Sequence, residues 1–372
     1  MPSFAAFGND LYSGRRSIDF ISRRKTWYLI AAVMMSIAIL GLGIRHLSLG
    51  IEFRGGSEFR VSGLAHPNES LASPAVNSVK AGTKVRPSLV GSNAVRVQTD
   101  QLSPAETTQV TDALAKAYGV KDTAISSSYV GASWGQDVTG KAAMSLVVFL
   151  IAVMILIGGY FRTWKMAVAG LAALLHDLLI TAGIYALVGF EVTPASVIGF
   201  LTILGYSLYD TVVVFDKVRE NTEHITATTK RTFAEAANLA VNQTLVRSIN
   251  TSVVALLPVG SILFIGAFVL GAGTLKDLAL ALFVGIAVGT YSSIFIATPL
   301  VVQLREMEPE IAAQADRVHR KRTEAASSDS ELGDGTLVAS ASGAGAAAEM
   351  RLPNGGQRSQ PRRNTTPRGT KR

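Results

Sequence analysis

Long apolar stretches separated by short polar segments dominate the chain. A helix rises about 1.5 Å per residue and the hydrocarbon core of a bilayer is about 30 Å thick, so about twenty mostly apolar residues are needed to cross it. The pattern therefore predicts a polytopic α-helical membrane protein with six transmembrane helices. These are approximately Trp27 to Ile44, Ala142 to Phe161, Met166 to Val188, Pro194 to Phe215, Thr251 to Leu270 and Leu278 to Val302.

Basic residues in the loops predict the orientation of these helices. They precede the first helix, and they recur between helices two and three and between helices four and five. The other short links, 189–193 and 271–277, contain only one basic residue, Lys276. Because Lys and Arg are retained on the cytoplasmic side, both termini are expected to be cytoplasmic. The segment between the first two helices is then exported.

The exported segment, residues 48–141, has the pattern of a small α+β domain. Ser57–Val61 and Asn93–Gln98 alternate like strands, and Asp122–Val130 is a third candidate. A helix is expected between the last two strands. The strand, helix, strand order is compatible with a ferredoxin-like domain, although several small folds share it.

The start and end of that helix are marked in the sequence. Ser103 is suited to the N-cap, Pro104 to the first helical position, and Glu106 closes a capping box. The helix is expected to run to Tyr118, because Gly119 is a typical C-terminal cap.

The character of the chain changes again after Val302. A charged, helix-like stretch continues to Thr323, and the residues beyond it have too few large apolar side chains to bury a core, which predicts disorder. Arg351–Arg372 contains seven basic residues and no acidic one. Contact with anionic lipid is expected here, with ribosome or nucleic-acid contact as the alternative.

Five segments are therefore expected along the chain. They are a cytoplasmic N-terminus (1–26), a first transmembrane helix (27–47), the exported α+β domain (48–141), transmembrane helices two to six (142–302) and a basic cytoplasmic tail (303–372).

Composition narrows the functional classes. Apolar residues make up 48% of the 372 residues, and the formal charge is +8 with the basic residues in loops and termini, so no specific nucleic-acid partner is expected. The chain has no cysteine, which excludes thiol catalysis and Cys-ligated metal sites. No phosphate-binding loop, metal-spaced His/Glu cluster or nucleophile elbow is present. We expect no enzymatic activity, no cofactor and no metal.

Charged groups at membrane depth cost about 2.5 to 3.5 kcal/mol each on insertion scales, so each one requires a reason. Asp210 in helix four and Arg247 before helix five are expected at similar depth and could pair. A carboxylate facing a guanidinium in a helical bundle is poised to take up and release a proton. The alternative is a static salt bridge that only fixes helix packing.

Other polar or small residues in these helices are possible supporting groups. His176 and Asp177 lie near the centre of helix three, and backbone carbonyls or hydroxyls could satisfy them without any function. Tyr206 and Thr211 flank Asp210 on helix four. Gly285 and Gly289 form a small-xxx-small face, which predicts close helix packing.

Several segments together resemble the SecF branch of the bacterial SecD/SecF protein-export family, within the resistance–nodulation–division (RND) superfamily. The run from Gly205 to Asn221, which reads Gly-Tyr-Ser-Leu-Tyr-Asp-Thr-Val-Val-Val-Phe-Asp-Lys-Val-Arg-Glu-Asn, is similar to that family's helix-four segment throughout. Arg247–Ser252 and His176-Asp177 are similar to its helix-five and helix-three segments.

The start of the exported domain carries a further resemblance. The segment Gly-Ile-Glu-Phe-Arg-Gly-Gly is similar to the family's Gly-Ile-Asp-Phe-x-Gly-Gly, with Glu in place of the usual Asp, and its matching positions are Gly50, Glu52, Phe53, Gly55 and Gly56. The resemblance covers approximately residues 25–303 and leaves out the tail.

What the resemblance implies is a six-helix subunit that assembles with SecD beside the SecYEG channel. There the pair would use the proton motive force to help draw polypeptides across the membrane, after the motor SecA has begun the work. The family's proton-relay positions fall on Asp210 and Arg247. The alternatives are an RND-type exporter of small molecules or lipids and a purely structural assembly subunit. Such an exporter is expected to carry two six-helix modules on one chain, with larger exported loops. Six helices and a small exported segment argue against it.

Overall fold

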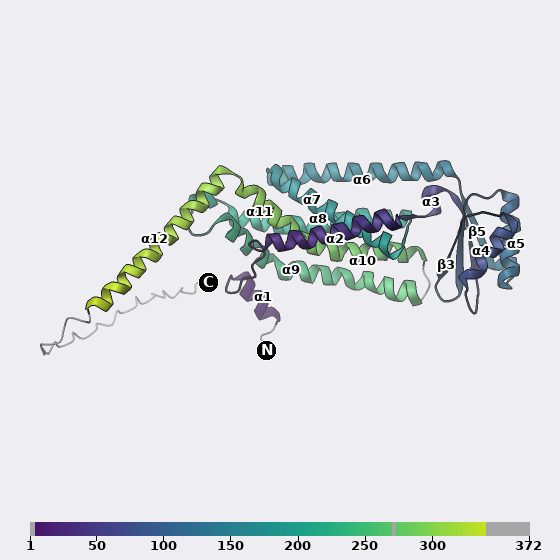
Figure 1. The fold of residues 1–372 in the computed structure, drawn as a ribbon, viewed down its shortest axis with the longest axis horizontal. Helices are drawn as coiled ribbons and strands as arrows, with labels where there is room; N and C mark the ends of the chain where they lie inside the picture. The colour runs from purple at the N-terminus through teal and green to yellow at the C-terminus, as the bar shows by residue number, and fades with distance from the viewer. Residues whose placement is uncertain (1–3, 270–272, 340–372) are drawn as a thin grey trace, which may run out of the picture. The chain divides into compact units, whose positions relative to one another are not determined.

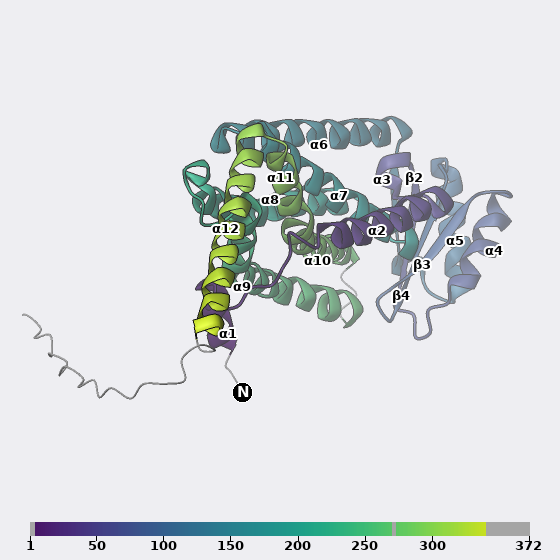
Figure 2. The ribbon, with the colours of Figure 1, turned by 60° about the vertical axis from the view of Figure 1, so that its left-hand side comes forward.

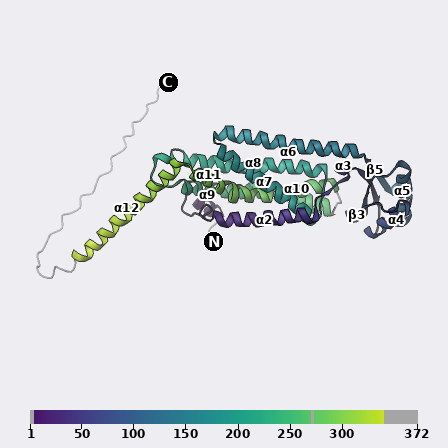
Figure 3. The ribbon, with the colours of Figure 1, turned by 45° about the horizontal axis from the view of Figure 1, so that its top comes forward.

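In a computed structural model, residues 4–269 and 273–339 are described, and within them six helices are long and apolar enough to cross a membrane. Figures 1 and 3 show these helices running alongside one another. The predicted class is confirmed. The helices are α2 (Arg24–Arg45), α6 (Ala132–Phe161), α7 (Trp164–Val188), α8 (Pro194–Thr222), α9 (Phe233–Ser261) and α10 (Gly273–Ser292). With the short helical segments that continue them, the last three spans reach Ala227, Gly266 and Glu306.

Several of these helices are longer than their apolar stretches. The α6 helix begins at Ala132, inside the segment expected to be exported, and α9 begins at Phe233 rather than near Thr251. The start of α9 is fixed by a capping box, in which the Thr232 hydroxyl accepts from the Glu235 N–H and the Glu235 carboxylate accepts from the Thr232 N–H. The first turns of α9 are polar, so a search for apolar stretches does not find the start of this helix. The Thr-x-x-Glu spacing, typical of a capping box, does indicate it.

Within the segment expected to be exported, the chain folds as an antiparallel four-stranded sheet with helices on one face. Its strands are β2 (Gly56–Ser62), β3 (Val85–Val90), β4 (Ala94–Thr99) and β5 (Ile125–Val130), in the order β3-β4-β2-β5. With α4 (Ala72–Val79) and α5 (Pro104–Tyr118) the chain order is β-α-β-β-α-β, the ferredoxin-like arrangement. Figures 1 and 2 show α4 and α5 on the same side of the sheet.

An apolar core lies between this sheet and its two helices. Phe59 and Val97 point from the sheet toward Val76 of α4 and Leu114 of α5, and all four side chains are buried. The α5 helix has the predicted ends: a complete capping box at Ser103 and Glu106, and Gly119 in the left-handed conformation with φ 66°. The three predicted strands and this helix are confirmed, and β3 and α4 are additional.

Two short links connect the α+β domain to the bundle. Strand β1 (Ser48–Leu49) pairs in parallel with β6 (Glu191–Val192), which lies between α7 and α8. From the sheet, the Arg96 guanidinium forms an ion pair of 2.6 Å with the Glu191 carboxylate. The helix α3 (Ile51–Arg54) inserts Phe53 among Tyr185 and Val192 at this end of the bundle.

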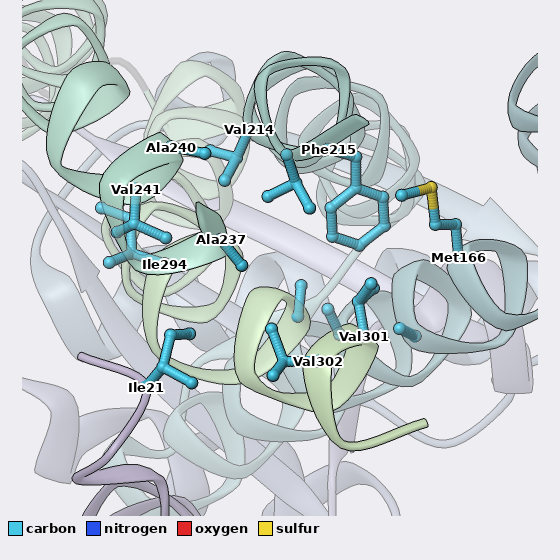
Figure 4. Close-up of a cluster of buried hydrophobic side chains, with 14 of the residues drawn as sticks. Ile21, Met166, Val214, Phe215, Ala237, Ala240, Val241, Ile294, Val301 and Val302 are labelled. Carbon is cyan, nitrogen blue, oxygen red and sulfur yellow. The ribbon is translucent and has the colours of Figure 1, made fainter. Parts of the chain in front are cut away.

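The helices pack around a large apolar cluster at the end where α8 and α9 are joined. Figure 4 shows Phe215 and Val214 of α8 converging with Ala237 and Val241 of α9. Residues Val301 and Val302 come from α11 (Thr298–Glu306), which continues α10. Between them, residues 293–297 form a π-helical segment, η5 (Ser293–Ala297).

The glycines of α10 allow it to pack tightly against α8. A Cβ atom added at Gly285 would overlap the side chain of Ile203, and one at Gly289 would lie 2.8 Å from the Cβ of Ser207. This is the close approach expected of a small-xxx-small face, and it holds α8 and α10 in a fixed register.

The last described helix, α12 (Pro309–Ala339), is longer than expected, because it continues past Thr323. Its start is anchored by buried Gln314, whose amide donates to the carbonyls of Thr228 and Arg231 in the α8–α9 link. The alanines at 325 and 326 favour a helix intrinsically. The basic run predicted for residues 351–372 lies outside the described residues.

Candidate functional site

The first buried carboxylate, Asp210, lies between α8, α9 and η5. Its side chain is only 6% exposed. One oxygen, Oδ1, accepts a hydrogen bond of 2.6 Å from the Ser248 hydroxyl of α9, and the other, Oδ2, accepts from the Ser293 hydroxyl at the start of η5. Its hydrogen-bond partners among the described residues are thus neutral hydroxyls.

The structure does not place Arg247 in a salt bridge with Asp210. Among the ion pairs of the described residues, none joins the two side chains. The contact to Asp210 comes from the next residue on α9, because Ser248, which follows Arg247 directly, donates to the Asp210 carboxylate. Arg247 itself is exposed, on a face of α9 that other helices of this chain leave uncovered. The expected direct pairing is therefore not observed, and Asp210 is bonded instead to Ser248, the residue after Arg247.

The second buried carboxylate is Asp177 on α7, which is 1% exposed. Its Oδ2 accepts hydrogen bonds of 2.5 Å from the Ser207 hydroxyl of α8 and of 2.8 Å from the Ser292 hydroxyl at the end of α10. Its Oδ1 lies 3.2 Å from Nδ1 of His176. Thr181 donates instead to the backbone carbonyl of Asp177. The carboxylate is thus satisfied by hydroxyls from two other helices.

Small hydroxyl side chains extend this network away from the carboxylates. The Ser252 hydroxyl donates to the carbonyl of Ser248 and lies 2.6 Å from the Thr290 hydroxyl of α10. The polar side chains therefore form a connected layer across α7, α8, α9 and α10, next to the large apolar cluster of the bundle.

The other predicted supporting residues are buried close to this layer without binding Asp210. The Tyr206 hydroxyl makes no hydrogen bond to Asp210, and the Thr211 hydroxyl has no partner among the described residues. Nε2 of His176 is likewise buried and unpartnered. Buried polar atoms of this kind are uncommon and are often associated with bound water or with function.

The residues that sequence reasoning missed are the serines. Ser207, Ser248, Ser292 and Ser293 supply the hydroxyls bonded to the two carboxylates, but serine is common and gives little indication of its role. Only Ser207 could have been found, because it lies three residues before Asp210 and so shares a face of the helix with it. The others depend on how α9 and α10 pack.

The segment Gly50–Gly56 holds the α+β domain against the bundle. The N–H of Gly50 donates to the carbonyl of Val192, and Gly56 has φ 145°, where an added Cβ would collide with the carbonyl of Thr99. Glu52 lies in this segment with one carboxylate oxygen buried and unpartnered. Burial raises the pKa of Glu52 above its ordinary value, and the carboxylates of Glu191 and Glu58 raise it further.

The chemistry available to this arrangement is reversible protonation. No group of three His, Cys, Asp or Glu side chains among the described residues could hold a metal ion. The two carboxylates sit inside a bundle of apolar helices and contact neutral hydroxyls, which can follow a carboxyl group through a change of charge by reorienting. The fold and the site define a polytopic helical membrane protein with protonatable groups buried among its helices.

Comparison with known proteins places this chain among protein-export components. The family model for the protein export membrane protein SecD/SecF, C-terminal, matches residues 109–307. The protein translocase subunit SecF of Streptomyces coelicolor is 47% identical over 330 residues, which cover 88% of this chain and 87% of that protein. The protein of the same name from Mycobacterium tuberculosis is 43% identical over 340 residues, covering 88% and 76%. The chain belongs to the SecD/SecF family of protein-export membrane proteins.

A solved structure agrees with this assignment. The crystal structure of SecDF, described as a translocon-associated membrane protein from Thermus, superposes with a TM-score of 0.67 at 28% identity and covers 78% of this chain. This chain spans 39% of the length of that solved chain. The match therefore concerns one part of a larger protein.

Proposed function

We propose that this chain is an auxiliary subunit of the Sec translocase which, together with SecD, uses the proton motive force to promote polypeptide export across the cytoplasmic membrane. Asp210 carries the proposal: it is a carboxylate buried among apolar helices, and its hydrogen bonds come from hydroxyls on α9 and η5, which are separate elements. A proton arriving at or leaving Asp210 changes the contacts that hold these elements together.

The energy available is sufficient for such a role. Moving one charge through the membrane field yields about 2.3 kcal/mol per 100 mV. A bias of that size changes a conformational equilibrium more than tenfold. In this proposal the protonation state of Asp210 is the input, and movement of the exported α+β domain, which is tied to the α7–α8 link through Arg96 and Glu191, is the output.

The expected topology places both termini in the cytoplasm and the α+β domain outside, by the positive-inside rule. The SecDF chains are more than twice as long as the part this chain matches, which supports SecD as a partner module of similar design. Large apolar side chains are exposed along α2, α6 and α9, and these faces are available to lipid and to that partner. The SecYEG channel, and SecA acting before it, complete the proposed assembly.

The proposed part of Arg247 is to act as a switchable counter-charge. It is exposed on α9 and adjacent to Ser248, so a modest rotation of α9 or contact with the partner would alter its distance from Asp210. A guanidinium that approaches in one state and withdraws in another would favour and then disfavour the charged carboxylate. No cofactor is needed, because the proton gradient is the energy source.

The test is Asp210→Asn in membrane vesicles that import a secretory polypeptide in a gradient-dependent manner. The amide keeps the volume of the side chain and cannot titrate, so we expect the complex to copurify intact while the gradient-dependent part of transport is lost. Asp216→Asn is the matched control, because Asp216 is an exposed carboxylate on the same helix that accepts a hydrogen bond from the Tyr160 hydroxyl. Normal gradient-dependent transport by Asp210→Asn would contradict the proposal.

A further inference from the structure

The two buried carboxylates are linked by a pair of consecutive serines. Ser292, the last residue of α10, donates to Asp177, and Ser293, the first residue of η5, donates to Asp210. The side chains of consecutive helical residues point about 100° apart. One turn of backbone can therefore donate a hydrogen bond to α7 from one hydroxyl and to α8 from the next. A shift of this backbone therefore affects both carboxylates together.

Helix α8 provides a second link between the same two groups. Ser207 donates to Asp177, and Asp210 lies three residues further on the same helix. Asp177 Oδ2 thus holds both elements that determine the surroundings of Asp210: α8, which carries it, and the end of α10, which carries its donor Ser293. Since Ser207 and Ser292 are both nearly inaccessible, solvent does not compete for these bonds.

The backbone at this point is suited to moving. The helix changes from α to π at Ser293, and the Thr298 hydroxyl bonds the carbonyl of Ser293. Single-turn π segments inside α-helices are frequent at functional sites, because a change between the two forms rotates the residues that follow. Asp177 holds the residue just before this change of form.

We infer that Asp177 is a positioning residue for Asp210. By anchoring Ser292 and Ser207, Asp177 sets the position of the Ser293 hydroxyl relative to Asp210. The inference rests on the proposed function of Asp210. It assigns to α7 a share in the proton-driven step, so that a change at Asp210 is passed through Ser292 to a third helix.

Other groups could influence the same titration and must be considered with it. Titratable or charged side chains also occur on the elements packed against α8. They are His176 on α7, Arg247 on α9 and Tyr291 on α10, together with Tyr206 and Tyr209 on α8 itself. None of them is changed by the variants below.

The test compares the pH at which gradient-dependent export is half-maximal in Ser292→Ala, Ser293→Ala and the unchanged protein. Ser293→Ala removes a donor from Asp210 directly. Ser292→Ala removes the bond to Asp177 and a bond to the Gly289 carbonyl of the same helix, and it leaves the two hydroxyls that bind Asp210 in place. We nevertheless expect it to move the midpoint in the same direction, by about one pH unit, a tenfold change in proton affinity. Ser292→Thr keeps the hydroxyl and should restore the midpoint. Ser261→Ala is the control, because its hydroxyl bonds only within its own helix and is exposed.

Three outcomes would overturn the inference. They are an unchanged midpoint in Ser292→Ala, failure of Ser292→Thr to restore it, and loss of the intact complex in Ser292→Ala, which would assign Asp177 to packing alone. The proposed function fails separately: it is refuted when Asp210→Asn exports normally. If Asp210→Asn is inactive and Ser292→Ala behaves like the unchanged protein, only the role of Asp177 is wrong.

Discussion

The α+β domain and the helical bundle distribute their polar groups in opposite ways. In the α+β domain the core between sheet and helices is a cluster of apolar side chains, and charged residues such as Arg60 lie on the surface. In the bundle the outward faces of α2, α6 and α9 carry large exposed apolar side chains, whereas Asp177 and Asp210 are inside. Water selects the first arrangement and a lipid environment the second.

The contrast separates residues that stabilise from residues that act. A buried charge in the α+β domain would cost stability without an alternative use, and that domain is held by apolar packing and helix caps. In the bundle the same cost is met by hydroxyls on α8, α9, α10 and η5. Variants should therefore lose function in the bundle and stability in the α+β domain.

The largest effect is expected from replacing Asp210 and Arg247 together, by Asn and Gln. If the two residues served only helix packing, neutralising both should be tolerated, since a double replacement leaves no charge without its counter-charge. We expect an intact complex without gradient-dependent export. The control is the exposed pair at the end of α8, Asp216→Asn with Arg219→Gln. Gradient-responsive export by the first double variant would reject the relay.

The next largest effect concerns packing within the bundle. Gly289→Leu would place a side chain where the Cβ of Ser207 already lies, and overpacking of this kind costs about 1 to 3 kcal/mol. Thermal unfolding in detergent should shift to lower temperature, and the complex should be recovered in lower yield. Gly43→Leu on α2, where nothing lies within 4 Å, is the matched control. Equal stability of the two variants would show that α8 and α10 are not in close contact.

In the α+β domain, Ser103→Ala should weaken α5 without affecting the bundle. It removes the acceptor of the capping box, which is worth about 1 kcal/mol. Hydrogen exchange of the first-turn amides of α5 should become faster, while gradient-dependent export changes little. Thr108→Ala, on the same helix, loses only a hydroxyl bonded to the Pro104 carbonyl and serves as the control. Loss of export in Ser103→Ala would contradict the expectation that variants in the α+β domain affect stability and not function.

A smaller, pH-dependent effect is expected at Glu52, where the two regions meet. Burial raises the pKa of Glu52 in the folded protein above its value in the unfolded chain. The folded state therefore loses stability as the pH rises from the unfolded-state pKa through the folded-state pKa, because the buried carboxyl group must ionise. Glu52→Gln should therefore be more stable than the unchanged protein at neutral pH and no different at acid pH, where Glu52 is protonated in both states. Thermal unfolding across pH measures this, with exposed Asp112→Asn as the control.

The smallest effect is expected from the C-terminal tail. A chain ending after Lys321 keeps the contacts of Gln314 and Arg317 with the α8–α9 link, so it should assemble and export at the normal rate. Export into vesicles and copurification would measure this. Reduced export by the shortened chain would mean that the tail binds something needed for function.

Local patterns were sufficient for much of the fold. The apolar stretches predict six spanning helices because a bilayer leaves no alternative for the backbone, and Ser103, Glu106 and Gly119 predict the ends of α5 because caps act within one turn. Strand β3 was missed, since Pro87 is unusual within a strand. It is tolerated there because β3 lies at the edge of the sheet, which is a property of the assembled sheet and not of the segment.

The sequence by itself determined the membrane class, the number of spans, the family resemblance and the two carboxylates, since a charge in an apolar run is conspicuous. Only the tertiary structure decided what those carboxylates touch. Depth along two helices predicts that Asp210 and Arg247 are near neighbours, but the rotation of α9 turns Ser248 inward and Arg247 outward. Rotation is set by packing against α8 and α10, through contacts between residues far apart in the chain, and no local pattern records it.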